Sequence, residues 1–142
     1  MGKGSGGTGR GGGPMSPRAV QSLLSRAGGV ISAVRATNAR RFENLTPGRL
    51  GVIEQAFEGR DATAVATGKR PANGGTVLPP IKLYVQRNRD GRTEVKIEDG
   101  RNRSVGAKAA GATHIRAVVV RETQNARGGW KQAKPVEMIV KL

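Results

Sequence analysis

The sequence predicts an α+β protein in which short helical segments precede a small mixed β-sheet. Residues 16–57 place apolar side chains at helical spacing, after Ser-Pro and Thr-Pro pairs that are typical of helix starts. Residues 78–142 instead alternate between apolar and polar side chains, with one interruption by an alanine-rich helical stretch. Of the 142 residues, 36% are hydrophobic and 3% are aromatic, so we expect one small aliphatic core.

The first 76 residues are predicted to contain a tail, a helical extension and a linker. Eight of the first thirteen residues are glycine, so residues 1–15 are predicted to be a disordered, basic, Gly-rich tail. Residues 4–9 match the dinucleotide fingerprint G-x-G-x-x-G, but no strand can precede them, and the match is rejected. Residues 16–60 are predicted to form a basic helical extension whose helices begin at Ser16-Pro17 and Thr46-Pro47. Residues 61–76, rich in Gly, Ala and Thr, indicate a loop or linker.

Residues 77–142 are predicted to form the β-rich unit. Alternation over residues 81–98 around Asp90-Gly91 predicts a β-hairpin. A helix over residues 101–110 follows and ends at Gly111. Residues 114–122 predict a further strand, and residues 136–142 a last one, at a sheet edge because Pro135 precedes it.

The charge of the chain indicates a polyanionic partner. The formal net charge is +15, and residues 1–42 carry seven Lys or Arg and no acidic residue. A basic arm of this kind is typical of proteins that contact nucleic acid. Trp130 either stacks on a base or covers part of the small core. The arginines predicted to contact nucleic acid are Arg35, Arg40 and Arg41 in the arm and Arg87, Arg89 and Arg92 in the hairpin.

The composition also excludes several functions. The chain has no cysteine, which excludes disulfides, thiolate metal sites and a cysteine nucleophile. It has no apolar run long enough to span a membrane, and its N-terminus lacks the apolar core of a secretion signal. A cytoplasmic protein without a membrane partner is therefore expected. The sequence is also compatible with a homo-oligomer.

The stretch IEDGRNRSVGAKAAG, residues 97–111, predicts a strand that leads into a helix through an Asp-Gly turn. Backbone N–H groups and the dipole at such a helix start favour an anion. Gly100 permits a tight turn and close approach of a ligand, and Arg101 and Arg103 supply planar donors for phosphate oxygens. Two arginines there are unfavourable by roughly 0.3–1 kcal/mol each without an anion. Asp99 has two interpretations, because it either caps the helix or holds a divalent metal.

Glu98 and Asp99 are the candidate catalytic residues. They follow each other at the end of the predicted strand, and the turn could bring both carboxylates to one metal ion. Such a pair suits phosphoryl transfer or phosphodiester cleavage. The alternative is an acidic strand end that only balances the nearby arginines.

The stretch LPPIKLYVQRNRDGRTEVKIEDGRNRSVGAKAAGATHIRAVVV, residues 78–120, resembles the N-terminal domain of the ParB/sulfiredoxin superfamily. The resemblance implies a ParB/sulfiredoxin-like fold that binds a nucleoside triphosphate, CTP or ATP, with Mg²⁺. Arg103 matches the arginine that closes the family motif, and Asp99 matches an acidic residue of the serine-kinase-like branch. The phosphate cradle that the resemblance implies comprises Gly100, Arg101, Asn102, Arg103 and Ser104.

Departures from the family limit the expected function. Sulfiredoxin activity is excluded, because the reductase cysteine would lie in this turn and the chain has none. A stand-alone core without the helix-turn-helix DNA reader of partition proteins is expected. The first hypothesis is a nucleotide-binding protein that hydrolyses or transfers phosphate. The alternatives are a non-enzymatic basic DNA-binding accessory protein of a phage or mobile element, and a metal-dependent ParB-like nuclease.

Overall fold

The computed structural model describes residues 15–38, 45–68 and 77–142. Residues 1–14 of the predicted Gly-rich tail, which is expected over residues 1–15, lie outside the described residues, as do Arg40 and Arg41. Within the described residues the chain is a mixed α+β protein with a five-stranded sheet, which confirms the predicted fold class.

The sheet is built around its longest strand, β4 (His114–Gln124). β2 (Ile81–Arg87) pairs with β4 in parallel and with β3 (Thr93–Asp99) in antiparallel orientation, so the predicted hairpin is confirmed. The other side of β4 pairs in succession with β6 (Val136–Lys141) and with β5 (Trp130–Gln132), both antiparallel. β6 pairs with β4 alone among the described strands, as expected for the edge strand that Pro135 indicated.

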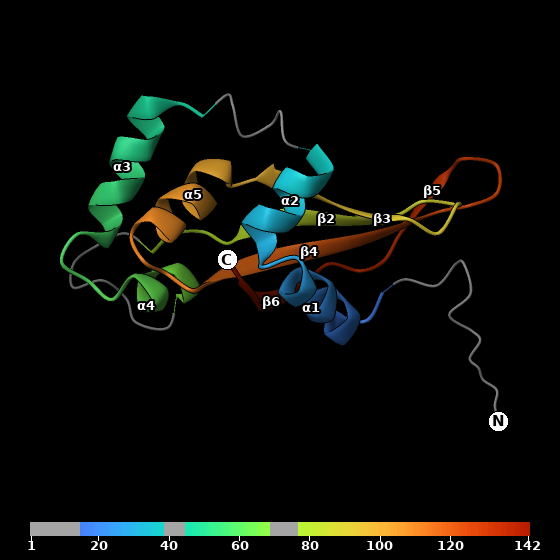
Figure 1. Cartoon of the computed structure of the whole chain (residues 1–142), viewed down its shortest axis with the longest axis horizontal. Helices are drawn as coiled ribbons and strands as arrows, with labels where there is room; N and C mark the ends of the chain where they lie inside the picture. The colour runs from blue at the N-terminus through green and yellow to red at the C-terminus, as the bar shows by residue number, and fades with distance from the viewer. Residues whose placement is uncertain (1–14, 39–44, 69–76) are drawn as a thin grey trace.

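One face of the sheet forms the core because apolar side chains alternate along its strands. Ile81, Leu83 and Val85 of β2 are buried, whereas the residues between them are half-buried. The registers extend this apolar face to Val95 and Val119 of the neighbouring strands. α1 (Pro17–Arg26) contacts β6, and α2 (Val30–Asn38) contacts β3, so the two helices lie across this face (Figure 1).

The N-terminal helices belong to the same hydrophobic core as the sheet. α1 begins where predicted, because the Ser16 side chain accepts a hydrogen bond of 3.1 Å from the Ala19 amide and Pro17 occupies the first turn. Its apolar stripe buries Val20 and Leu24 completely against the sheet-derived core. The Thr37 hydroxyl of α2 donates a hydrogen bond of 2.7 Å to the Val95 carbonyl, which fastens α2 to β3.

The predicted linker over residues 61–76 is wrong at its beginning, where the chain forms α4 (Ala62–Thr67). The Asp61 side chain accepts from the Ala64 amide as the N-cap, and Gly68 closes the helix in the left-handed conformation. Val65 and Ala66 are buried in the core. A six-residue helix gives too little periodicity to be distinguished from a small-residue loop, so burial revealed it and composition did not. Residues 69–76 lie outside the described residues.

Two more helices complete the fold and form its end away from the hairpin turns. α3 (Pro47–Phe57) packs against α5 (Arg101–Ala109), and α5 follows β3 directly, as the sequence predicted (Figure 1). No helix in the described ranges is long and apolar enough to cross a membrane.

Candidate functional site

A pocket of about 280 Å³ lies where the starts of α3 and α5 meet. The start of α3 contributes Thr46 and Arg49, the middle of α3 contributes Ile53, and the end of β3 contributes two carboxylates. The turn and first helical residues that the sequence singled out form the rest of the wall. The described residues of the lining are Thr46, Arg49, Ile53, Glu98, Asp99, Gly100, Arg101, Asn102 and Arg103.

Close packing of α3 against α5 brings together these two segments, which are far apart in the sequence. A Cβ atom placed on Gly106 of α5 would lie 2.5 Å from Cγ2 of Ile53 on α3, which is closer than real side chains approach. Glycine at this position therefore allows α3 to approach the backbone of α5. The first turn of α3 then lies beside the first turn of α5.

Gly100 is the N-cap of α5, and this corrects the interpretation of Asp99 as the cap. Gly100 has a φ of +103°, and the helix start receives no hydrogen bond from a capping side chain. A Cβ atom on Gly100 would lie 2.4 Å from Cγ2 of Ile81, so only glycine fits between the turn and β2. The Asp99 carboxylate instead pairs with Arg103 at 3.3 Å and is 72% exposed.

A β-bulge places both carboxylates on the same pocket. The register pairs Lys82 with Asp99 and Leu83 with Ile97, so Glu98 is the extra residue of β3. In a regular strand, consecutive side chains point to opposite faces, whereas a bulge redirects one of them. Glu98 and Asp99 both line the pocket for this reason.

Arg103 is held in the pocket by two hydrogen bonds. Its side chain is 15% exposed, and its Nη2 donates to the Pro80 carbonyl at 3.2 Å and to the Asp99 carboxylate at 3.3 Å. Its buried Nε has no hydrogen-bond partner, and neither does the buried Oδ1 atom of Asn102. Buried polar atoms without partners are unusual in folded proteins. Two of them beside one pocket are consistent with a polar ligand.

The electrostatics of the two helix starts favour an anion. Thr46 is the N-cap of α3, but its side chain makes no capping hydrogen bond, and neither helix has an acidic residue in its first turn. The positive ends of both helix dipoles therefore face the pocket together with Arg49, Arg101 and Arg103. Arg49 makes no hydrogen bond or ion pair with the residues that the structure describes.

Ser104 lies outside the pocket although it belongs to the predicted phosphate cradle. Its side chain is completely buried, and its hydroxyl donates a hydrogen bond of 2.9 Å to the Arg101 carbonyl inside the helix. The first turn of α5 directs residues 101–103 to the pocket and turns the next residue toward the core. Helical geometry accounts for this difference from the predicted cradle.

The predicted Mg²⁺ ion has two candidate ligands in the pocket, the carboxylates of Glu98 and Asp99. Among residues 15–38, 45–68 and 77–142, no three His, Cys, Asp or Glu side chains gather in a group suited to a metal. Mg²⁺ is usually bound through one or two carboxylates, water and substrate phosphates, and it needs no larger protein cluster. Glu98 and Asp99 meet that lower requirement, because both line the pocket.

The arginines predicted to contact nucleic acid do not lie at the pocket. Arg89 and Arg92 are exposed at the β2–β3 turn, Arg87 is half-buried at the end of β2, and Arg35 is exposed near the end of α2. None of these four lines the pocket. Sequence reasoning missed Thr46, Arg49 and Ile53 as pocket residues. The Thr46-Pro47 helix start was visible in the sequence, but its position beside α5 depends on the packing of Ile53 against Gly106.

Comparison with known proteins adds no assignment, because no family model, no curated protein and no solved structure matches the chain. The resemblance to the ParB/sulfiredoxin superfamily therefore stays a prediction.

Proposed function

We propose that this pocket binds the phosphate groups of a nucleoside triphosphate together with Mg²⁺, in a protein of ParB/sulfiredoxin-like fold. The observation that carries the proposal is the convergence of two helix starts without side-chain caps, each with arginine in its first turn. Cations at the positive end of a helix are unfavourable unless an anion is present. A bound phosphate makes this arrangement favourable, because its negative charge attracts both the positive ends of the helix dipoles and the arginines.

The size of the pocket supports a binding mode in which the pocket encloses only the phosphate chain of the nucleotide. Pockets that bury a complete small ligand usually measure about 300–1,000 Å³. A pocket of about 280 Å³ suits a phosphate chain with its metal, and the base and ribose extend beyond it. Among the described residues of the lining, Ile53 is the one aliphatic side chain and none is aromatic. Affinity therefore depends mainly on the phosphates, and discrimination between bases is weak.

Each group of the pocket has a distinct role in this proposal. Arg49 and Arg101 contact phosphate oxygens, and the Thr46 hydroxyl donates a further hydrogen bond. Arg103 shapes the turn through Pro80 and Asp99 and adds positive charge. Glu98 and Asp99 hold the Mg²⁺ ion, which neutralises phosphate charge and polarises the phosphoryl group for hydrolysis or transfer.

The test is a calorimetric titration of CTP, ATP and GTP with Mg²⁺ into the wild type at about 0.15 M salt. Arg49→Gln is the informative variant, because Arg49 has no partner among the described residues and its loss leaves the turn intact. A charge-assisted hydrogen bond contributes about 1.5–3 kcal/mol, so we expect affinity to fall roughly 10- to 150-fold. Arg60→Gln is the matched control, because Arg60 is exposed just after α3 and its side chain bonds only to the Ala56 carbonyl among the described residues.

Two results would contradict the proposal. One is the absence of binding of any of the three nucleotides to the wild type. The other is an equal affinity loss in Arg49→Gln and Arg60→Gln, which would indicate attraction to net charge alone. Competition by inorganic triphosphate is expected, and its absence would show that the base and not the phosphate is recognised.

A further inference from the structure

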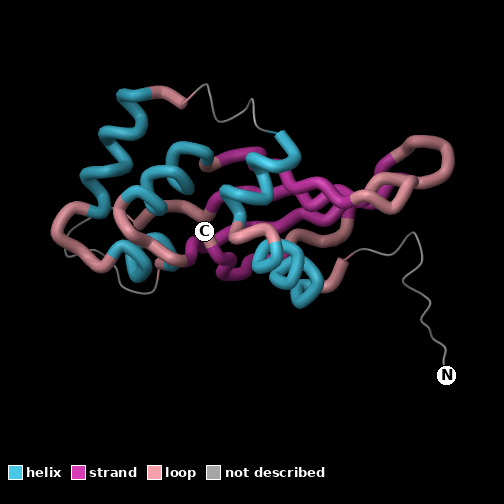
Figure 2. The backbone as a smooth tube through the Cα atoms, viewed as in Figure 1, coloured by secondary structure: helices cyan, strands magenta, loops and turns pink. Residues whose placement is uncertain are grey.

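The two hairpin turns of the sheet lie side by side and form a tip that hydrogen bonds join. The Arg89 guanidinium on the β2–β3 turn donates a hydrogen bond of 3.1 Å to the Ala126 carbonyl on the β4–β5 turn. The Arg89 amide also donates to the Gln124 side chain at 3.3 Å. Asn125 fixes the second turn by accepting bonds of 2.9 Å from the amides of Arg127 and Gly129. The tip projects beyond the helices, at the opposite end of the molecule from α3 (Figures 1 and 2).

The tip is strongly basic. Residues 87–92 and 125–131 contain five basic residues and one acidic residue. That acidic residue, Asp90, is already paired with Arg92 at 2.9 Å. The Arg127 and Lys131 side chains are exposed and make no hydrogen bond or ion pair with the described residues. We define the hairpin-tip surface as Arg87, Arg89, Arg92, Arg127, Trp130 and Lys131.

The strand registers align part of this surface. Arg87 is paired with Thr123, and Thr123 with Lys131, so Arg87 and Lys131 lie in one row across the sheet and on the same face. The buried Nε of Arg87 has no hydrogen-bond partner. The nearest row along the strands holds Glu122, whose two carboxylate oxygens accept from Gln86 and Gln132 at 2.7 Å each. Alternation along β4 places Glu122 on the opposite face of the sheet from Arg87 and Lys131, so its carboxylate points away from that basic row.

An exposed aromatic ring lies on the opposite face of the same sheet edge, because Trp130 directly precedes Lys131 in β5. Trp130 begins β5 opposite Gln124, and 43% of it is exposed, so the interpretation of Trp130 as a cover for the core is wrong. A half-exposed indole that follows the turn of the exposed Arg127 is suited to a ligand that is both anionic and aromatic. Single-stranded nucleic acid has this chemistry, because its bases stack on aromatic rings while its phosphates contact Arg and Lys.

We propose that the hairpin-tip surface binds single-stranded nucleic acid that passes around the β5 edge of the sheet, with a base stacked on Trp130 on one face and phosphates held by Arg127 at the turn and by Lys131 and Arg87 on the other face. The surface is separate from the pocket between α3 and α5, so this proposal does not depend on nucleotide binding there. A single strand is favoured over a duplex because bases in a duplex are already stacked on one another and do not present their faces to Trp130.

The fluorescence of Trp130 can be used to follow binding, because the chain contains only one tryptophan. Titration of the wild type with a thymidine oligonucleotide of about 12 residues, within the range of single-strand site sizes, should quench its fluorescence. Binding to fluorescein-labelled oligonucleotide, followed by anisotropy, then compares variants without relying on tryptophan. Trp130→Ala should weaken binding about 5- to 150-fold, whereas Trp130→Phe should retain most of the affinity, since a ring remains for stacking.

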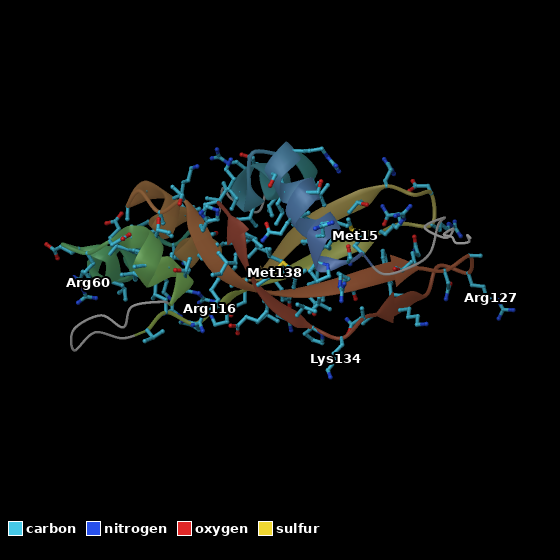
Figure 3. The ribbon with its side chains drawn as sticks, turned by 90° about the horizontal axis from the view of Figure 1, so that it is seen from below. Met15, Arg60, Arg116, Arg127, Lys134 and Met138 are labelled. Carbon is cyan, nitrogen blue, oxygen red and sulfur yellow. The ribbon has the colours of Figure 1, made fainter. Side chains whose placement is uncertain are left out.

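The charge contribution is tested by a pair of matched substitutions. Arg127→Gln and Arg60→Gln remove one positive charge each, at opposite ends of the molecule (Figure 3). Each lost phosphate contact lowers the slope of log K against log salt by about 0.7 for a single strand. That decrease is expected for Arg127→Gln and not for Arg60→Gln. Equal effects of the two substitutions, unquenched tryptophan, or tighter binding of a duplex of the same length would each overturn the proposal.

Discussion

Gly106 of α5 faces Ile53 of α3 so closely that a Cβ atom on Gly106 would lie 2.5 Å from the Cγ2 methyl of Ile53. This contact sets the distance between the two helices. It therefore also sets the width of the pocket between their first turns, which Ile53 itself lines. The dimensions of the candidate site depend on a packing contact one turn away from its polar groups.

Gly106→Ala should destabilise the protein although alanine is the better helix former. The added methyl group overlaps Ile53, and overpacking of this kind costs about 1–3 kcal/mol. In an Ile53→Ala background the methyl has room, and the same change should stabilise by up to about 1 kcal/mol through helix propensity. Chemical denaturation of the four variants measures this reversal of sign. The same sign in both backgrounds would show that the two helices do not meet as described.

Gly100→Ala should lower the free energy of unfolding more than Gly91→Ala does. Both glycines have positive φ, +103° and +88°, which costs an alanine about 1–2 kcal/mol. Only Gly100 also has a neighbour in the way, because its added Cβ would lie 2.4 Å from Ile81, whereas nothing lies within 4 Å of Gly91. The difference between the variants in urea denaturation should be about 1–3 kcal/mol. Equal losses would indicate that backbone conformation alone requires the glycine.

The strands and most helices could be predicted from the sequence because their signals are local. The alternation on both sides of Asp90-Gly91 determines the hairpin, and Ser16-Pro17 determines the start of α1. Short elements gave no comparable signal. α4 has six residues and β5 has three, and each is defined by its tertiary neighbours, β4 in both cases.

Only one wall of the candidate site could be predicted from the sequence. Residues 98–103 are contiguous, so their turn and helix start were visible as a motif. Thr46 and Arg49 lie about fifty positions earlier in the sequence and reach the pocket through side-chain packing that no local pattern encodes. The bulge at Glu98 was equally hidden, because strand register depends on the partner strand.

Ser104→Ala should leave nucleotide affinity unchanged and reduce stability only slightly. The Ser104 hydroxyl is buried and bonded to the Arg101 carbonyl, so its removal costs one neutral hydrogen bond, at most about 1 kcal/mol. The calorimetric titration used for Arg49→Gln, combined with thermal denaturation, separates the two effects. A tenfold loss of affinity with unchanged stability would return Ser104 to the phosphate site and would require a different rotation of α5.

Asp90 should titrate below the ordinary aspartate value of 3.8. The Arg92 backbone amide, which donates to the carboxylate at 2.9 Å, is the main cause of the lowered pKa, and the Arg92 guanidinium adds a second bond of 2.9 Å. Because the pKa is lowered in the folded state, the stabilisation by this carboxylate is present above pH 3.8 and is lost as the pH falls through the lowered value. Carbon-detected NMR titration of the Asp90 carboxyl measures the midpoint directly. Arg92→Gln should raise the midpoint only in part, since the backbone amide remains, and a wild-type midpoint at or above 3.8 would contradict the described turn.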